Sequence, residues 1–255
     1  MTKALVLVIA VCVTLTLRAA DPVVTSIWKP DTATVDGSTI EWKSLETLTK
    51  GLEFAAANDG TSLYLVLLAS TDVMRVSVAR GLVFWFDVGG GHKETFGLLL
   101  PGPAPLDPGS LGRSSANAMR LTPVVSDHID LLREKLSRRL IDLTPESGAA
   151  VATGGEDGAV VFELKVPLVR SDGKPLGLGT TPGSAISVGI ATPPMKKEQE
   201  DRGTTYYFDP YAGARISGIY GPGPLQPPLP DSSNKPEKEV KPKNLDFWTT
   251  VRLAK

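Results

Sequence analysis

Short apolar or alternating runs, separated by glycine, proline, asparagine and aspartate, follow one another through most of this 255-residue chain. Runs of this kind are typical of β-strands joined by turns. The clearest ones begin at Leu52, Ser62, Gly81, Glu94, Ala159 and Ser184. The sequence therefore predicts an all-β fold, an antiparallel β-sandwich of the jelly-roll kind, and such sandwiches often reach this length as one domain.

The polarity of single runs indicates where each strand lies. Apolar and charged residues alternate in FELKV (162–166), so this strand is expected to have one face in the core. LYLVLL (63–68) is apolar on both faces, which predicts a central strand that is covered on both sides.

One helix is expected, from Asp127 to Leu143. Leucine and isoleucine recur there at spacings of three and four residues, and Ser126 or Asp127 could cap the start. Such an amphipathic helix would pack on the sandwich; a short interaction helix is the alternative.

The C-terminal region predicts a long loop followed by one strand. Residues 221–243 are rich in proline and charge, a composition that cannot hold a strand ladder or a core. Only NLDFWTTVRLAK follows, which is too short for a domain. We therefore expect a proline-rich loop inside the domain, after which a strand with Phe247, Thr249 and Val251 on one face returns to the sheet.

Residues 1–20 have the pattern of a secretory signal peptide. Lys3 precedes an apolar run of about 14 residues, which small residues end at Ala19 and Ala20, whereas a membrane-spanning helix needs about 20 apolar residues. An uncleaved anchor is the alternative, since Arg18 is unusual so close to a cleavage site. We expect a secreted or periplasmic domain of residues 21–255 without disulfides, because Cys12 is the only cysteine.

Charge and motifs restrict the function classes. Removal of Lys3 and Arg18 leaves 25 basic and 28 acidic residues, a formal charge of −3, and no basic patch that would suit a nucleic acid. The two histidines, His92 and His128, are far apart, and no HExxH or GxSxG motif is present. An enzyme is therefore not favoured, although a pair of glycosidase carboxylates is not excluded by counting. The glycine-rich DVGGGHKETFG connects two strands and predicts a hairpin turn.

Several motifs, in order, resemble the family 9 carbohydrate-binding modules and their DOMON-like relatives. They are VDGSTIEW (35–42), AANDGTSLYLVLLASTD (56–72), GLVFWFDVGGG (81–91), FELKVPL (162–168) and the closing FWTTVRLAK. The similarity covers nearly all of residues 23–255, with the expected helix and the proline-rich loop as insertions. Most of these motifs are structural, and we expect no attached catalytic domain, which would be a departure from the family.

This resemblance implies a β-sandwich that binds polysaccharides or oligosaccharides through aromatic side chains. No cofactor is expected beyond a structural calcium ion that such modules sometimes carry, for which the turn acids Asp36, Asp59 and Asp72 are candidates. DOMON-like relatives bind haem or sugar, and the chain offers Met74, Met119 and Met195 as axial haem ligands.

The best candidate for a sugar platform is LVFWFDV (82–88). Alternation places Phe84 and Phe86 on the core face and Trp85 with Asp87 on the other. An indole beside a carboxylate offers an apolar plate for a sugar ring and an acceptor for its hydroxyl groups. A covered Trp85 would instead indicate a structural or protein-interaction sandwich of the cell envelope.

A single indole would bind weakly, so a second aromatic residue is required. Tyr207, in the strand end TTYYFDPYAGA, and Trp42, beside the DG turn, are the next ligand-binding candidates. Further candidates are Trp28, Tyr206 and Tyr211.

Overall fold

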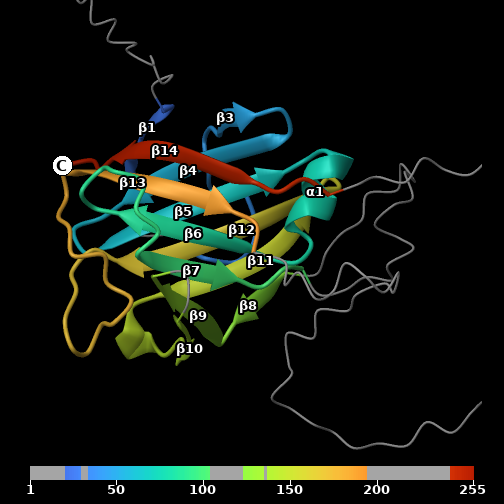
Figure 1. The fold of residues 1–255 in the computed structure, drawn as a ribbon. Helices are drawn as coiled ribbons and strands as arrows, with labels where there is room; N and C mark the ends of the chain where they lie inside the picture. Colours follow the sequence, from blue (N-terminus) through green and yellow to red (C-terminus); the bar gives the residue numbers. More distant parts are fainter. Residues whose placement is uncertain (1–20, 30–33, 104–122, 135–136, 194–241) are drawn as a thin grey trace, which may run out of the picture.

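The computed structural model describes residues 21–29, 34–103, 123–134, 137–193 and 242–255, which form two β-sheets packed face to face (Figure 1). Sheet A contains, in spatial order, β1 (Val23–Thr25), β14 (Asp246–Arg252), β13 (Ala185–Ala191), β6 (Leu82–Asp87), β7 (Phe96–Leu100), β9 (His128–Arg133) and β10 (Ser137–Asp142). Sheet B contains β2 (Ile27–Trp28), β4 (Leu52–Asn58), β5 (Ser62–Ala69), β12 (Ala159–Pro167), β11 (Ala150–Glu156) and β8 (Val124–Ser126), and β3 (Glu46–Thr49) also pairs with β4. The predicted all-β sandwich is confirmed.

Two parallel pairs interrupt an otherwise antiparallel arrangement. β1 pairs with β14 and β2 pairs with β4, so residues 23–28 supply one edge strand to each sheet. At the crossing point, the buried Ser26 hydroxyl donates to Asn58, and the Ala254 N–H lies 2.8 Å from Ser26 Oγ and 2.7 Å from Asn58 Oδ1. This polar junction joins the N-terminal, β4 and C-terminal segments.

The core lies between the sheets and is formed by the alternating faces that the sequence predicted. Phe84 from sheet A and Phe54 and Phe162 from sheet B are fully buried there. β5 lies between β4 and β12 and is buried over nearly all of its length, so the prediction of a central strand covered on both sides is confirmed.

The predicted helix over residues 127–143 is wrong. The structure has two strands there, β9 and β10, which pair antiparallel around a turn in which Glu134 takes a φ of 52°. Ile129, Leu131 and Ile141 point into the core with the period of two that a strand requires. The apolar residues of this segment also fit the helical spacing of three and four. The pairing of β9 with β7 selects the strand over the helix.

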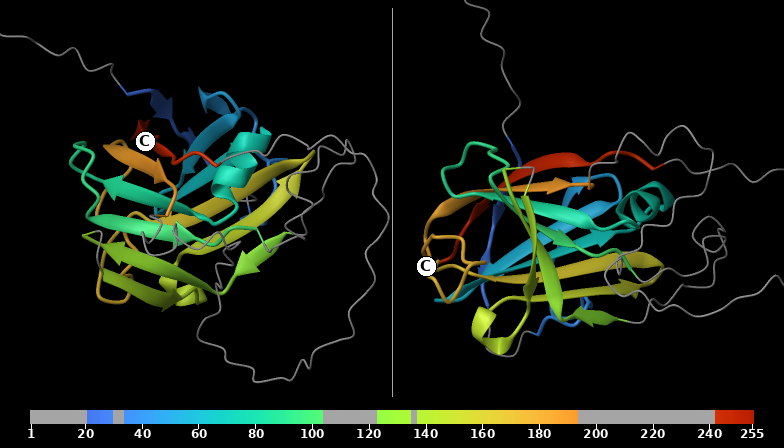
Figure 2. Two further views of the ribbon diagram at one scale, coloured as in Figure 1. Left: turned by 45° about the vertical axis from the view of Figure 1, so that its right-hand side comes forward. Right: turned by 60° about the horizontal axis from the view of Figure 1, so that its bottom comes forward.

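The one α-helix found among the described residues is α1 (Asp72–Val78), which lies at one end of the sandwich (Figure 2). Thr71 caps it, since its hydroxyl accepts the N–H of Met74, and Met74 and Val78 are buried. Its sequence, DVMRVSV, is rich in β-branched residues and gave no helical signal. A single turn of 3₁₀-helix, η1 (Pro145–Ser147), precedes β11.

The last strand returns to the sheet as predicted. β14 pairs with β1 and β13, and Thr249 and Val251 are buried while Phe247 packs against the core. The predicted proline-rich loop lies outside the described residues except at its end, where the N–H of Lys243 donates to Ser77 of α1 at 2.8 Å.

The predicted signal peptide, residues 1–20, also lies outside the described residues. In the described part of the chain, no helix is long and apolar enough to cross a membrane.

Candidate functional site

The outward face of sheet A carries a row of tryptophan and glycine across four neighbouring strands. In register, Trp248 of β14 pairs with Gly189 of β13, Gly189 with Trp85 of β6, and Trp85 with Gly97 of β7. Leu132 of β9 continues the row beyond Gly97. Two strands that are distant in the sequence, β6 and β14, thus place two indoles on one face of the sheet.

The glycines let the two indoles lie flat on the sheet. A Cβ atom on Gly97 would come within 2.5 Å of Trp85 Cε3, and one on Gly189 within 2.9 Å of Trp248 Cε2. Such approaches are closer than any real side chain permits, so each tryptophan covers the backbone of the neighbouring strand. Val83, Leu99, Leu132 and Ala191 complete this apolar cluster around the two indoles.

Trp85 is only 6% exposed, and Trp248 is partly buried. Neither indole N–H donates to another residue in the ranges that the structure describes. Because no buried side-chain nitrogen or oxygen there lacks a hydrogen-bond partner, both N–H groups must reach the surface. Each tryptophan therefore presents an unused donor at the edge of a largely covered ring.

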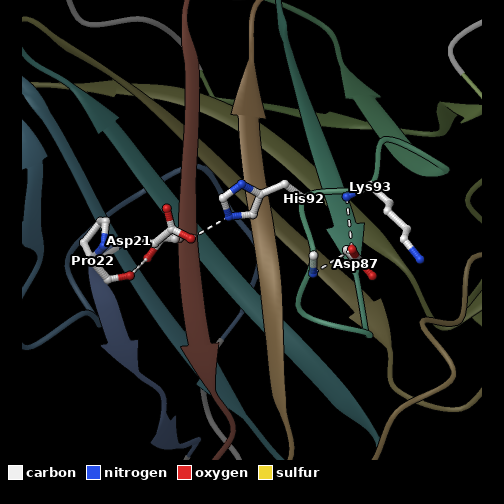
Figure 3. Close-up of polar contacts among 7 residues, drawn as sticks. Asp21, Pro22, Asp87, His92 and Lys93 are labelled. Carbon is white, nitrogen blue, oxygen red and sulfur yellow. Dashed lines mark hydrogen bonds and ion pairs between the residues drawn. The ribbon is translucent and has the colours of Figure 1, made fainter. Parts of the chain in front are cut away.

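Asp87 organises the turn after β6. Its Oδ1 accepts the N–H of Gly89 at 2.9 Å, and its Oδ2 accepts those of Gly91 at 2.8 Å and Lys93 at 3.0 Å (Figure 3). Burial by itself raises the pKa of Asp87, but these donors and the Lys93 charge outweigh it and hold the pKa below its ordinary value. The predicted hairpin turn is confirmed, and Asp87 is its central acceptor.

The turn presents His92 to the second tryptophan. The His92 and Trp248 rings are stacked, with centroids 4.7 Å apart and planes 15° apart. Since one face of Trp248 lies on Gly189, His92 covers the other. His92 Nε2 contacts the Asp21 carboxylate, which precedes β1 (Figure 3).

Trp42, the fourth predicted site residue, lies on the opposite side of the sandwich. It packs on the outward face of sheet B against Ala55, Val66 and Val161, and its indole N–H donates to Glu163 Oε1 at 2.8 Å. Trp42 and Trp85 are therefore not brought together.

Glu163 fastens the segment that carries Trp42. Its Oε2 accepts the N–H groups of Asp36 and Gly37, both at 2.8 Å, and it is 1% exposed. Burial raises the pKa of Glu163 above its ordinary value, despite the opposing hydrogen bonds from Trp42, Gly37 and Asp36. The DG turn and the FELKV strand, two motifs of the family resemblance, thus meet in one structural contact.

A cation lies beside this contact. The Lys29 ammonium is 4.0 Å from the centroid of the Tyr64 ring and 5.4 Å from that of Trp42. Burial lowers the pKa of Lys29, although the Glu41 and Glu163 carboxylates partly counteract it. Burial and a hydrogen bond to Asp59 raise the pKa of Tyr64 to about 12. Burial thus weakens proton binding at Lys29, whereas the Tyr64 hydroxyl is held in its protonated form.

The three aspartates predicted to bind calcium each bond to different partners. Asp36 accepts the N–H of Ser38, Asp59 accepts from Thr61, Ser62 and Tyr64, and Asp72 pairs with Arg75. Within the described ranges, no group of three His, Cys, Asp or Glu residues could hold a metal ion. Calcium binding stays a prediction.

The sequence-based search missed Trp248, His92 and the two glycines. The alternation of FWTTV already put Trp248 opposite Phe247 and Thr249, so its outward position was available from the sequence. Its alignment with Trp85 was not, because strand order decides it. Tyr207, Tyr206, Tyr211, Met119 and Met195 lie outside the described residues.

No known family model matches this sequence, and no curated protein matches it. Among solved structures, it is similar to a family 9 carbohydrate-binding module from Caldicellulosiruptor kristjanssonii in complex with glucose. The alignment has 9% identity and a TM-score of 0.31, and covers 69% of this chain and 80% of the module. Similarity at this level carries no argument about ligands, so the function must be argued from the residues.

Proposed function

We propose that this protein is a non-catalytic carbohydrate-binding domain whose ligand contacts the outward face of sheet A. The observation that carries the proposal is the row of Trp248, Gly189, Trp85 and Gly97, in which each indole lies flat on the strand next to its own and its N–H donates to no other described residue. Sugars bind to such surfaces because their C–H faces stack on aromatic rings while their hydroxyl groups bond to nearby polar groups.

The area of contact predicts weak binding. Covering about 100 Å² of apolar surface on one indole contributes roughly 2–3 kcal/mol, and association costs several kcal/mol. Trp85 is 6% exposed and Trp248 is partly buried, so each indole offers less than this area, and we expect a dissociation constant of about 1 mM or weaker. Asp130 and Arg138, an ion pair with an N–O distance of 2.6 Å beyond Leu132, add polar groups on the same sheet.

The roles of the predicted residues change in this proposal. Trp85 remains the central ligand residue, Trp248 replaces Trp42 as the second one, and Asp87 acts mainly by fixing the turn. Asp87 Oδ1 accepts one N–H and therefore keeps one acceptor position that a hydroxyl group could use. Tyr207 stays a prediction.

A structural or protein-interaction sandwich is the second candidate function. The observation that favours it is the low exposure of Trp85, 6%, together with the coverage of Trp248 by His92. A domain of this kind would use the outward tryptophans only to stabilise the sheet, and would bind no glycan.

The export of the protein is part of the proposal and has its own test. If residues 1–20 are a signal peptide, the protein recovered outside the cytoplasm will begin near Asp21. N-terminal sequencing or intact mass will decide this, since an uncleaved anchor would retain residues 1–20.

Isothermal titration with soluble xylan, cellulose and β-glucan fragments tests the binding proposal. We expect binding by the wild type, loss of binding in Trp248→Ala, and unchanged binding in Trp28→Ala, an exposed tryptophan on an edge strand of sheet B. Absence of binding to every fragment, or equal loss in both variants, would reject the proposal in favour of the second candidate.

A further inference from the structure

His92 covers the face of the Trp248 indole that points away from the sheet. His92 lies parallel to the indole at a centroid distance of 4.7 Å, which is the arrangement of a stacked ring ligand. The opposite face of the indole rests on Gly189. A pyranose ring therefore cannot stack on Trp248 while the imidazole stays in place.

We infer that His92 is an internal occupant of the ligand position on Trp248, and that glycan binding displaces its side chain. This inference rests on the proposed function, because it names the step that controls access to the same site. His92 then lowers the apparent affinity of the site for a glycan, because only the molecules in which His92 has left Trp248 can bind one.

The backbone around His92 is fixed, so the movement is confined to the side chain. Asp87 holds the N–H groups of Gly91 and Lys93, the residues on either side of His92. The imidazole projects from this turn over β13 toward Asp21, which lies beside β14 (Figure 3). A rotation about the side-chain torsions of His92 is enough to uncover Trp248 without any change in the turn.

Two contacts hold His92 on the indole, and both must be lost on displacement. One is the ring stack with Trp248, and the other is the pair with Asp21. His92 also has a φ of 60°, which a non-glycine residue rarely adopts and which the Asp87 contacts maintain. The turn is thus built to present this side chain at this place.

The first test measures the access of a small neutral quencher to Trp248 and requires no glycan. The four indole N–H signals are recorded by nuclear magnetic resonance and assigned with Trp→Phe variants, and acrylamide is then titrated. We expect His92→Ala to shift the Trp248 signal and to increase its response to acrylamide, while His128→Ala, which changes the other histidine, leaves both unchanged. An unchanged Trp248 signal in His92→Ala would overturn the inference.

The second test uses the soluble glycan fragment that binds the wild type. We expect His92→Ala to bind about three- to tenfold more tightly, the factor that loss of one ring stack would give. His92→Phe keeps the stack and should bind no more tightly than the wild type. Weaker or equal binding by His92→Ala would mean that His92 is itself a ligand contact or a bystander, and would overturn the inference.

The two tests separate the failure of this inference from the failure of the proposed function. If no fragment binds any variant while Trp248 becomes accessible in His92→Ala, the coverage by His92 stands and the carbohydrate proposal falls. If a fragment binds the wild type and His92→Ala changes neither the access nor the affinity, the carbohydrate proposal stands and this inference falls.

Discussion

The outward faces of the two sheets both carry tryptophan, but they hold the indole in different ways. On sheet B, Trp42 comes from a segment that crosses the strands, and its N–H is bonded to the buried Glu163. On sheet A, Trp85 and Trp248 belong to the strands themselves, lie on glycine, and donate to no other described residue. The state of the indole N–H therefore separates a tryptophan that seals a face from one that could meet a ligand.

The bonding of Glu163 predicts the largest effect. Glu163→Ala leaves the N–H groups of Asp36, Gly37 and Trp42 without their acceptor, and we expect a loss of about 3 kcal/mol of unfolding free energy. Urea denaturation measures it. Glu53→Ala, on the same face of β4, is the matched control and should cost less than about 0.5 kcal/mol. Equal losses in the two variants would contradict the role of Glu163 as a fastening residue.

The second-largest effect on stability is expected at Gly97, on which the Trp85 indole lies flat. Gly97→Ala forces Trp85 off the strand, and we expect a loss of about 1–3 kcal/mol together with a change in tryptophan emission. Gly60→Ala is the control, since a Cβ atom there would meet no atom within 4 Å. In a Trp85→Ala background, Gly97→Ala should cost much less. An equal cost in both backgrounds would mean that the glycine does not serve the indole.

Lowering the pH should change the contributions of Asp87 and Glu163 to the free energy of unfolding in opposite directions. The pKa of Asp87 is lowered in the folded state, so its contribution is present at neutral pH and is lost as the pH falls below the ordinary value of 3.8. The pKa of Glu163 is raised, so its proton binds more tightly in the folded state and stability is gained as the pH falls toward 4.5.

Urea midpoints from pH 7 to pH 3 test this difference. The advantage of the wild type over Asp87→Asn should shrink as the pH falls, whereas its advantage over Glu163→Gln should grow between neutral pH and about pH 4.5, the ordinary value for this carboxyl. Parallel curves for the wild type and either variant would show that the environment of that carboxylate does not shift its pKa.

The smallest effect is expected at Trp28. This residue is 51% exposed on the short edge strand β2, and Trp28→Ala should change the unfolding free energy by less than about 0.5 kcal/mol. A larger loss would show that exposed tryptophans also stabilise the sandwich, and would weaken the contrast between the two faces.

The sequence predicted the strands of the core well, because a period of two is set locally by which residues avoid water. It assigned Phe84 and Phe86 to the core and Trp85 to the other face, as the structure has them. It failed at residues 127–143, where one set of leucines satisfies two periods, and at α1, where packing of Met74 and Val78 outweighs a preference for strand.

The candidate site was predicted only in part. Trp85 was predicted from its neighbours in the sequence, since alternation within one strand is enough to place it on the outward face. Trp248, 163 residues later in the chain, joined the site only through the order of β14, β13 and β6 in the sheet. The same strand order places Trp42 on the other side of the sandwich, although Trp42 carries the same indole ring.

The sequence by itself determined which residues face the core, where the chain turns, and which residue types an outward face would carry, because solvent and backbone sterics act on each strand separately. Only the tertiary structure decided which strands became neighbours. The order of the strands aligned Trp85 and Trp248 with two glycines in one row. It also placed the indole N–H of Trp42 beside Glu163 and stacked His92 on Trp248. Strand order has this effect because contacts across a sheet join residues that no local rule connects.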